Sequence, residues 1–267
     1  MGVRTACLAS FLSISGALSA GAEIATTWNE HPNAKVRLIA GEGRLLGVEL
    51  VLAPGWKTYW RMPGDAGVPP SFDWAGSVNL KSIEVLYPAP VSMADQGGIA
   101  VGYKGTVIFP VQVTLDDEAK PAVAELEFAF GVCKDICIPV ESKLKLPIAA
   151  AKAWPGAAPL KGALAQVPRT TSEPAKGTPA LVAFSSMLTG SAPRLTFETR
   201  GATDLYVEAP DGLFIPLATK SKDQADLTTF VVDLEKTPDL ADLPGKVLRV
   251  TITGRAGAID TSIPLKP

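Results

Sequence analysis

Cys133 and Cys137 are the residues of this sequence whose type and spacing could support chemistry. They lie in the segment VCKDICIP, residues 132–139, with three residues between them. Two neighbouring thiols can cycle between dithiol and disulfide by exchange with a partner protein. The same pair can form an inert disulfide, as in many exported proteins. Closing so small a ring contributes only about 2 kcal/mol to stability, so spacing alone leaves both interpretations open.

The segments around the two cysteines alternate apolar and other residues, which predicts strands over residues 123–132 and 140–148. In a continuous strand, residues four apart are separated by ~13 Å, too far for a disulfide. The chain must therefore turn if the two cysteines are to bond. Gly131 and Pro139 suit the end of one strand and the start of the next. We predict a tight turn at one end of a sheet.

His31 is the single histidine of the sequence. One histidine before the first predicted strand excludes a Ser/His/Asp or Cys/His catalytic apparatus and a histidine-based zinc site. Two cysteines alone make a weak zinc site. Copper binding by the two thiolates is a further alternative, but four methionines and one histidine are fewer than such a site would lead us to expect. We expect neither a metal nor a cofactor.

Residues 1–22 have the features of a secretory signal peptide. Arg4 supplies the positive start, residues 7–18 form an apolar run, and Ala20-Gly21-Ala22 suits cleavage, so Cys7 would be removed. No later stretch approaches the ~18 apolar residues of a membrane span. The net charge of −2, or −3 without Arg4, argues against nucleic acid as a partner. We expect a soluble periplasmic protein that does not insert into the membrane.

The remaining sequence is typical of an all-β protein, with 24 glycines, 23 prolines and many short apolar runs. We predict two immunoglobulin-like β-sandwich domains, residues 23–149 and 179–267, joined by an Ala/Pro-rich linker over 150–178 with a helical turn near 160–166. The second domain lacks cysteine, histidine and tryptophan, and we assign it no chemistry. The strands predicted besides the two already given are 35–40, 44–53, 78–87, 105–115, 181–184, 194–198, 204–208, 213–218, 228–234, 247–253 and 258–264.

Residues 55–74 lie between two predicted strands, and three of the five tryptophans fall there. Gly and Pro are too frequent for a strand throughout, and long ordered loops are uncommon without a role. This loop either caps the cysteine turn with its aromatic side chains or fills a small core of its own as an Ω-loop. The second interpretation suits most of its residues. Tyr59, Trp60 and Asp65 are the candidates for a cap or a partner contact.

Three motifs resemble, in this order, the periplasmic N-terminal domain of the thiol:disulfide interchange protein DsbD: WKTYWRMPGDAG at 56–67, GYKG at 102–105 with FPV at 109–111, and VCKDICIP at 132–139. The similarity covers roughly residues 30–150 and is closer to the ScsB-type relatives. It implies an immunoglobulin-like sandwich with protein-disulfide reductase activity. Cys133 and Cys137 would be the redox pair, Cys137 would bond to partners, and Tyr103 joins the possible cap or partner contacts.

The resemblance also implies the partners. In this family the domain takes electrons from a membrane-embedded thiol carrier and passes them to periplasmic thioredoxin-fold proteins. The sequence departs from the family in three ways: Met62 replaces an asparagine, the cysteines are closer together than in the best-known member, and no transmembrane carrier follows. We therefore expect a separate electron donor. The alternative is a non-catalytic binding or assembly module with an inert disulfide.

Overall fold

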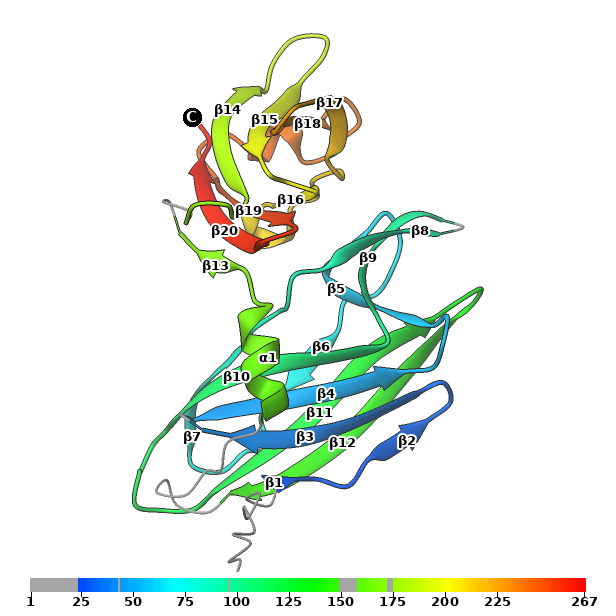
Figure 1. The fold of residues 1–267 in the computed structure, drawn as a ribbon, viewed down its shortest axis with the longest axis vertical. Coiled ribbons are helices and arrows are strands. Elements are labelled where there is room, and N and C mark those ends of the chain that lie inside the picture. The colour runs from blue at the N-terminus through cyan, green and yellow to red at the C-terminus, as the bar shows by residue number, and fades with distance from the viewer. Residues whose placement is uncertain (1–23, 43, 96, 149–157, 172–174) are drawn as a thin grey trace, which may run out of the picture.

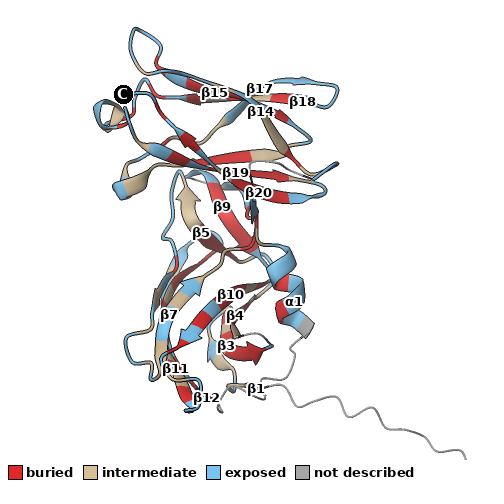
Figure 2. Cartoon of the chain, turned by 90° about the vertical axis from the view of Figure 1, so that its left-hand side faces the viewer, coloured by how far each residue is buried: buried red, intermediate tan, exposed pale blue. Residues whose placement is uncertain are grey.

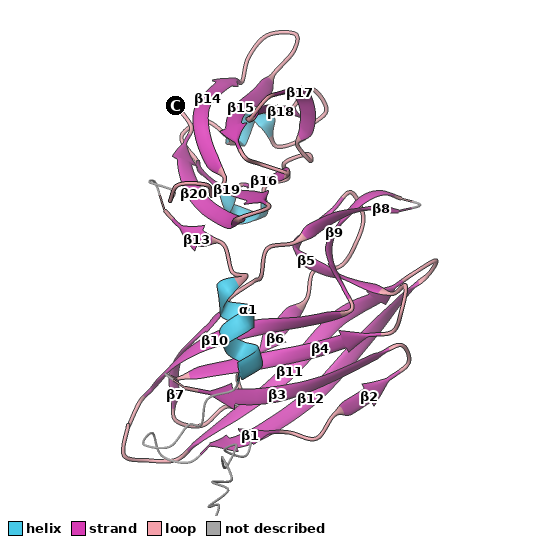
Figure 3. Cartoon of the chain, in the orientation of Figure 1, coloured by secondary structure: helices cyan, strands magenta, loops and turns pink. Residues whose placement is uncertain are grey.

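The computed structural model describes residues 24–42, 44–95, 97–148, 158–171 and 175–267. These residues form four β-sheets arranged as two sandwiches, one above the other in Figure 1. Strands dominate, as Figure 3 shows, and all but one of the strand pairs are antiparallel. The predicted all-β, immunoglobulin-like fold class is confirmed. The predicted signal peptide, 1–22, lies outside the described residues.

The N-terminal sandwich contains strands β1 to β12. Its first sheet has the order β1-β3-β4-β10-β7, with β2 beside β3, and its second has the order β12-β11-β5-β9-β8, with β6 beside β11. The strands of the first sheet are β1 (Ile24–Ala25), β2 (Asn29–His31), β3 (Ala34–Gly41), β4 (Leu45–Leu52), β7 (Leu80–Val85) and β10 (Thr106–Leu115). The strands of the second are β5 (Lys57–Gly64), β6 (Ser71–Asp73), β8 (Val91–Asp95), β9 (Gly98–Lys104), β11 (Ala122–Cys133) and β12 (Cys137–Ile148).

The C-terminal sandwich contains strands β13 to β20. Its sheets have the orders β13-β20-β19-β16 and β14-β15-β18-β17. The strands of the first are β13 (Arg169–Thr170), β16 (Asp204–Glu208), β19 (Val247–Gly254) and β20 (Gly257–Pro264). The strands of the second are β14 (Ala180–Met187), β15 (Arg194–Arg200), β17 (Thr219–Gln224) and β18 (Leu227–Asp233), and short 3-10 turns lie at Pro210–Gly212 and Leu240–Asp242.

Alternation of apolar and polar residues explains how these strands bury a core. In β12, for example, Val140, Leu144 and Leu146 point inward and are buried, while Lys143 and Lys145 between them are exposed. Figure 2 shows buried residues concentrated between the sheets of each sandwich. Each sandwich has its own large apolar cluster. The chain is thus organised around two cores, and the cysteines lie at an end of the first.

Helix α1 (Ala158–Ala165) lies within the predicted linker, where we expected only a helical turn over 160–166. It packs on β10 and β4 of the first sheet. Leu160 lies against Ile39 and directly over Gly47, where an added Cβ would approach its Cδ2 to 2.4 Å. Glycine at position 47 therefore permits this close contact. No helix in the described part of the chain is long and apolar enough to cross a membrane.

The expectation of a loop over residues 55–74 is wrong, because most of this segment is β5 and β6. β5 pairs with β9 through Lys57, Thr58 and Tyr59 and again at Gly64. The pairing is interrupted between Tyr59 and Gly64, which is where Pro63 lies. A proline lacks the N–H that a regular ladder needs, so the irregularity accommodates it. The Ω-loop interpretation fails as well, since Trp56, Phe72 and Trp74 pack against the main core instead of a small core of their own.

Most other strand predictions are confirmed, but one predicted strand is absent and several observed strands were not predicted. The prediction of a strand at 213–218 is wrong. Residues 213–218 form no strand, and strand β17 begins directly after them, at Thr219–Gln224. The apolar residues there anchor a loop, as shown by the buried Ile215. Strands β1, β2, β9 and β13 were not expected. Strand β8 was not expected either. Gly and Ala around it give little strand signal, and its register with β9 depends on the whole sheet.

Candidate functional site

The two cysteines close the β11–β12 hairpin. These strands pair without interruption from Ala122 opposite Ile148 to Cys133 opposite Cys137. A disulfide joins the two sulfur atoms, and the Cα atoms lie 4.1 Å apart. Residues 134–136 form the loop between them. The predicted turn at the end of a sheet is confirmed, and Gly131 and Pro139 are opposite each other just before it.

The two cysteines differ in their accessibility. Cys133 is 1% exposed and packs in a small apolar cluster with Tyr59, Met93 and Ala100. Cys137, at the start of β12, is exposed to solvent. A disulfide that presents one cysteine to solvent and buries the other can be attacked by a large partner from one side only. The arrangement therefore distinguishes a residue that can meet a partner from one that cannot.

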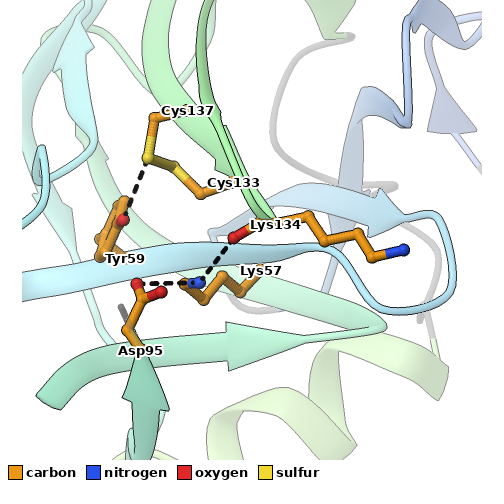
Figure 4. Close-up of a disulfide and its surroundings, with 6 residues drawn as sticks. All are labelled: Lys57, Tyr59, Asp95, Cys133, Lys134 and Cys137. Atoms are coloured by element: carbon orange, nitrogen blue, oxygen red, sulfur yellow. Dashed lines mark hydrogen bonds and ion pairs between the residues drawn. A yellow bond between two sulfur atoms is a disulfide. The ribbon is translucent and has the colours of Figure 1, made fainter. Parts of the chain in front are cut away.

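Tyr59 lies against the disulfide, and Figure 4 shows its hydroxyl group pointing at Cys137. The hydroxyl oxygen is 3.3 Å from the Cys137 Sγ atom. Burial, together with the nearby Asp95 carboxylate, raises the pKa of the Tyr59 phenol above its usual value. Gly67 lies over the ring, where a Cβ would come within 2.4 Å of Cε1. The phenol is thus held in place and kept neutral beside the sulfur.

Lys57 is the second side chain that structures the site, and it is only 7% exposed. In the sheet, Lys57 is the backbone partner of Cys133, at the point where strand β5 meets strand β11. The Lys57 Nζ atom lies 2.9 Å from an Asp95 carboxylate oxygen and donates a hydrogen bond of 3.4 Å to the Lys134 carbonyl oxygen. Figure 4 shows this chain of contacts from β8 to the cysteine loop. A buried ammonium group therefore ties the loop to the neighbouring strands.

Sequence analysis did not identify Lys57 or Asp95. Lys57 was missed because the segment that forms β5 was predicted to be a loop. Residues two apart on a strand share a face, so a predicted strand would have placed Lys57 beside Tyr59. Asp95 ends strand β8, which was not predicted, and no local pattern marks it. The tertiary pairing of β5 with β9, and of β9 with β8, brings these two residues to the cysteines.

The other three candidates for a cap or partner contact occupy different places. Trp60 is completely buried in the main core, and Tyr103 is 7% exposed and donates a hydrogen bond of 2.8 Å to the Pro88 carbonyl oxygen. Asp65 accepts a hydrogen bond of 2.7 Å from the Ile99 N–H, which connects the segment after β5 to β9. Of the four candidates, the structure brings Tyr59 into hydrogen-bonding contact with a cysteine.

Comparison with known families identifies the N-terminal sandwich. Residues 26–149 match the family "Thiol:disulfide interchange protein DsbD, N-terminal". This part of the chain is a DsbD-like N-terminal domain. The resemblance inferred from the three motifs is thereby confirmed, and the disulfide hairpin belongs to a thiol:disulfide interchange domain. No curated protein matches the sequence significantly.

A solved structure extends the comparison beyond the DsbD N-terminal domain. The chain is similar to the N-terminal periplasmic domain of ScsB from Proteus mirabilis, with a TM-score of 0.68 and 24% sequence identity. The alignment covers 92% of this chain and 99% of that chain. Its coverage includes both sandwiches. The two-sandwich fold is therefore shared with the ScsB domain.

Among the described residues, no group of three or more His, Cys, Asp or Glu side chains could hold a metal ion. The side chains that contact Cys137 or hold the cysteine loop include one phenol, one ammonium group and one carboxylate, from Tyr59, Lys57 and Asp95. These groups can donate hydrogen bonds to sulfur or hold the loop. The disulfide beside these groups can take part in thiol and disulfide exchange.

Proposed function

We propose that this chain is a periplasmic thiol:disulfide interchange protein that passes electrons from a membrane-embedded thiol carrier to thioredoxin-fold partners. The observation that carries the proposal is the pairing of an exposed Cys137 with a buried Cys133 in one disulfide, beside the Tyr59 hydroxyl group. An inert disulfide would need no such asymmetry. Membership of the DsbD N-terminal family supports the same conclusion.

The electrons move in pairs. The donor's dithiol reduces the Cys133–Cys137 disulfide, which takes up two electrons and two protons while the donor becomes a disulfide. The Cys137 thiolate then attacks one sulfur of the acceptor's disulfide, and the other acceptor sulfur leaves as a thiolate. Cys133 attacks the Cys137 sulfur of this mixed disulfide, releases the acceptor as a dithiol and restores the intramolecular bond.

The surrounding residues assist in two ways. The Tyr59 hydroxyl group can donate a hydrogen bond to the Cys137 sulfur when it carries negative charge. Lys57 holds the carbonyl group of Lys134, so the loop keeps its position when the disulfide opens. Cys133 then stays within reach of Cys137. The site residues of the proposal are therefore Cys133 and Cys137, with Tyr59 and Lys57 in supporting positions.

A trapping experiment tests the assignment of roles. Cys133→Ala and Cys137→Ala, both reduced, are incubated with an oxidised thioredoxin-fold protein that has a Cys-x-x-Cys pair. We expect a mixed disulfide to be detected with Cys133→Ala after acid quenching and alkylation of free thiols, because the exit through Cys133 is gone and only back-attack by the acceptor's own second thiol remains. Little should form with Cys137→Ala, whose remaining thiol is buried. Non-reducing gels and mass spectrometry identify the adducts.

Two outcomes would contradict the proposal. Equal adducts in both variants would remove the assignment of Cys137 as the residue that meets partners. Adducts in neither variant, together with a wild-type disulfide that resists reduction in glutathione buffers, would indicate an inert disulfide in a binding module.

A further inference from the structure

Strand β16 of the C-terminal sandwich faces strands β5 and β8 of the N-terminal sandwich (Figure 1). Its Tyr206 is 1% exposed and packs in the N-terminal core, where its ring centroid lies 5.4 Å from that of Trp60. The Tyr206 hydroxyl group and the Ser92 Oγ atom are 2.9 Å apart. One residue of β16 therefore contacts both β5 and β8.

Glu208, two residues further along β16, makes a second attachment. Its carboxylate accepts hydrogen bonds of 2.9 Å and 3.1 Å from the Arg61 Nε atom and one of 2.9 Å from the Arg61 Nη2 atom. Arg61 also donates a hydrogen bond of 3.2 Å to Thr251 on β19, and its guanidinium carbon lies 4.0 Å from the centre of the Trp60 ring. Both charged side chains are largely buried. The three hydrogen bonds from Arg61 fix the geometry of the pair.

These attachments reach the two strands that carry the polar groups of the site. Strand β5 carries Lys57, Tyr59 and Arg61 at every second position, and a strand rises only ~3.3 Å per residue. A displacement at Arg61 is therefore transmitted along the strand to Tyr59 and Lys57. Ser92 and Asp95 both lie on β8, three residues apart. The C-terminal sandwich thus contacts both strands that supply the Lys57–Asp95 ion pair.

We infer that Tyr206 and Glu208 are positioning residues for the Cys133–Cys137 exchange, acting as a clamp on β5 and β8. The clamp holds Lys57 and Tyr59 against the disulfide loop, where the Tyr59 hydroxyl group can donate a hydrogen bond to a Cys137 thiolate, so it stabilises the reduced state. Loosening the clamp therefore favours the disulfide. The inference rests on the proposed exchange function and assigns a role to the C-terminal sandwich, which has no cysteine of its own.

The test compares redox equilibria of the full chain. Wild type, Glu208→Gln and Tyr206→Phe are equilibrated in thiol–disulfide buffers of graded ratio, and the reduced fraction is measured by thiol alkylation and mass spectrometry. Glu208→Gln removes the charge of the ion pair, and Tyr206→Phe removes only the hydroxyl group that contacts Ser92. We expect the equilibrium constant to shift toward the disulfide by about threefold or more in each variant.

Glu49→Gln is the matched control. Glu49 is a largely buried carboxylate that accepts a hydrogen bond of 2.7 Å from Arg37, but it lies on β4 of the other sheet. We expect its equilibrium constant to stay within about 1.5-fold of wild type. Circular dichroism spectra check that each variant is folded, and Glu208→Asp, which keeps the charge, should recover part of the shift.

The outcomes separate the clamp from the proposed function. Unchanged equilibria in both Glu208→Gln and Tyr206→Phe overturn the clamp, even where Cys133→Ala traps a partner normally. An equal shift in Glu49→Gln also overturns it, since the effect would then be one of general stability. A shift in the two clamp variants alone, with no trapped partner, supports the clamp and removes the exchange function.

Discussion

The hydroxyl oxygen of Tyr59 lies 3.3 Å from the Cys137 Sγ atom, although 78 residues separate the two in the sequence. Burial and the Asp95 carboxylate raise the pKa of this phenol, so the hydroxyl group keeps its proton at neutral pH. A neutral hydroxyl group can donate to a sulfur anion. Tyr59 is therefore placed to stabilise the charge that forms on Cys137 when the disulfide opens.

Replacing Tyr59 by phenylalanine tests this relationship. Tyr59→Phe keeps the ring that packs on Cys133 and removes only the donor, so we expect slower thiol–disulfide exchange at neutral pH. One hydrogen bond to a charged group is worth ~1.4 kcal/mol, or a factor of about ten in thiolate fraction, and the higher nucleophilicity of the more basic thiolate offsets part of it. The loss in rate should therefore be about threefold. Stopped-flow kinetics of the reduced protein with an oxidised thioredoxin-fold protein measure it. Tyr87→Phe, which alters another partly buried tyrosine, is the control, and equal rates in both variants would contradict the role of Tyr59.

Lys57→Met should destabilise the protein, because Asp95 would lose its ion-pair partner and the Lys134 carbonyl group its donor. Asp95 is partly exposed, so we expect a loss of about 1–3 kcal/mol, less than for a fully buried pair. Urea unfolding of the oxidised protein measures it. The double variant Lys57→Met with Asp95→Leu should lose less than the sum of the single variants. Strict additivity would show that the two charges do not interact.

Removing both cysteines should leave the fold intact. Cys133→Ala with Cys137→Ala deletes a disulfide that closes a very small loop, and we expect a loss of about 2 kcal/mol. The β11–β12 hairpin keeps the uninterrupted pairing that begins at Ala122 and Ile148. Thermal unfolding by circular dichroism should stay cooperative. Loss of the cooperative transition would identify the disulfide as a structural staple and weaken the exchange function.

Alkaline pH should weaken the fold through its tyrosines. Burial raises the pKa of all four: Tyr59, Tyr87, Tyr103 and Tyr206. In the unfolded chain a tyrosine titrates near pH ~10, so the unfolded state loses its protons first as the pH rises. The stability contributed by the neutral phenols is complete below that pH and is lost as the pH rises through the folded-state pKa values.

We therefore expect constant stability between about pH 8 and 9.5 and a decline above pH ~10, by at most about 1.4 kcal/mol per pH unit for each tyrosine. Urea midpoints across this range measure it. Tyr206→Phe removes one of the four groups, so its decline should be less steep. A steeper decline than wild type would contradict the assignment of the raised pKa to Tyr206.

Local pattern was sufficient to predict the cysteine turn. Alternation through Phe128 and Phe130, followed by Gly131, the cysteine pair and Pro139, predicts two strands and a reversal between them. Each of these signals acts over a few residues, because backbone preference and side-chain period are local properties. The order of the three motifs was enough to indicate the DsbD family.

The tertiary structure alone decided which side chains surround the disulfide. Lys57 and Asp95 meet because β5, β9 and β8 are neighbours in one sheet, and Arg61 meets Glu208 because two sandwiches pack together. Strand pairing is set by burial across the whole sheet, so a segment with Pro63 and Gly64 can become a strand against its local preference. The Lys57–Asp95 contact joins residues that are 38 positions apart, and the Arg61–Glu208 contact joins residues that are 147 positions apart. Such contacts leave no local periodicity in the sequence, because they depend on the free energy of the assembled cores.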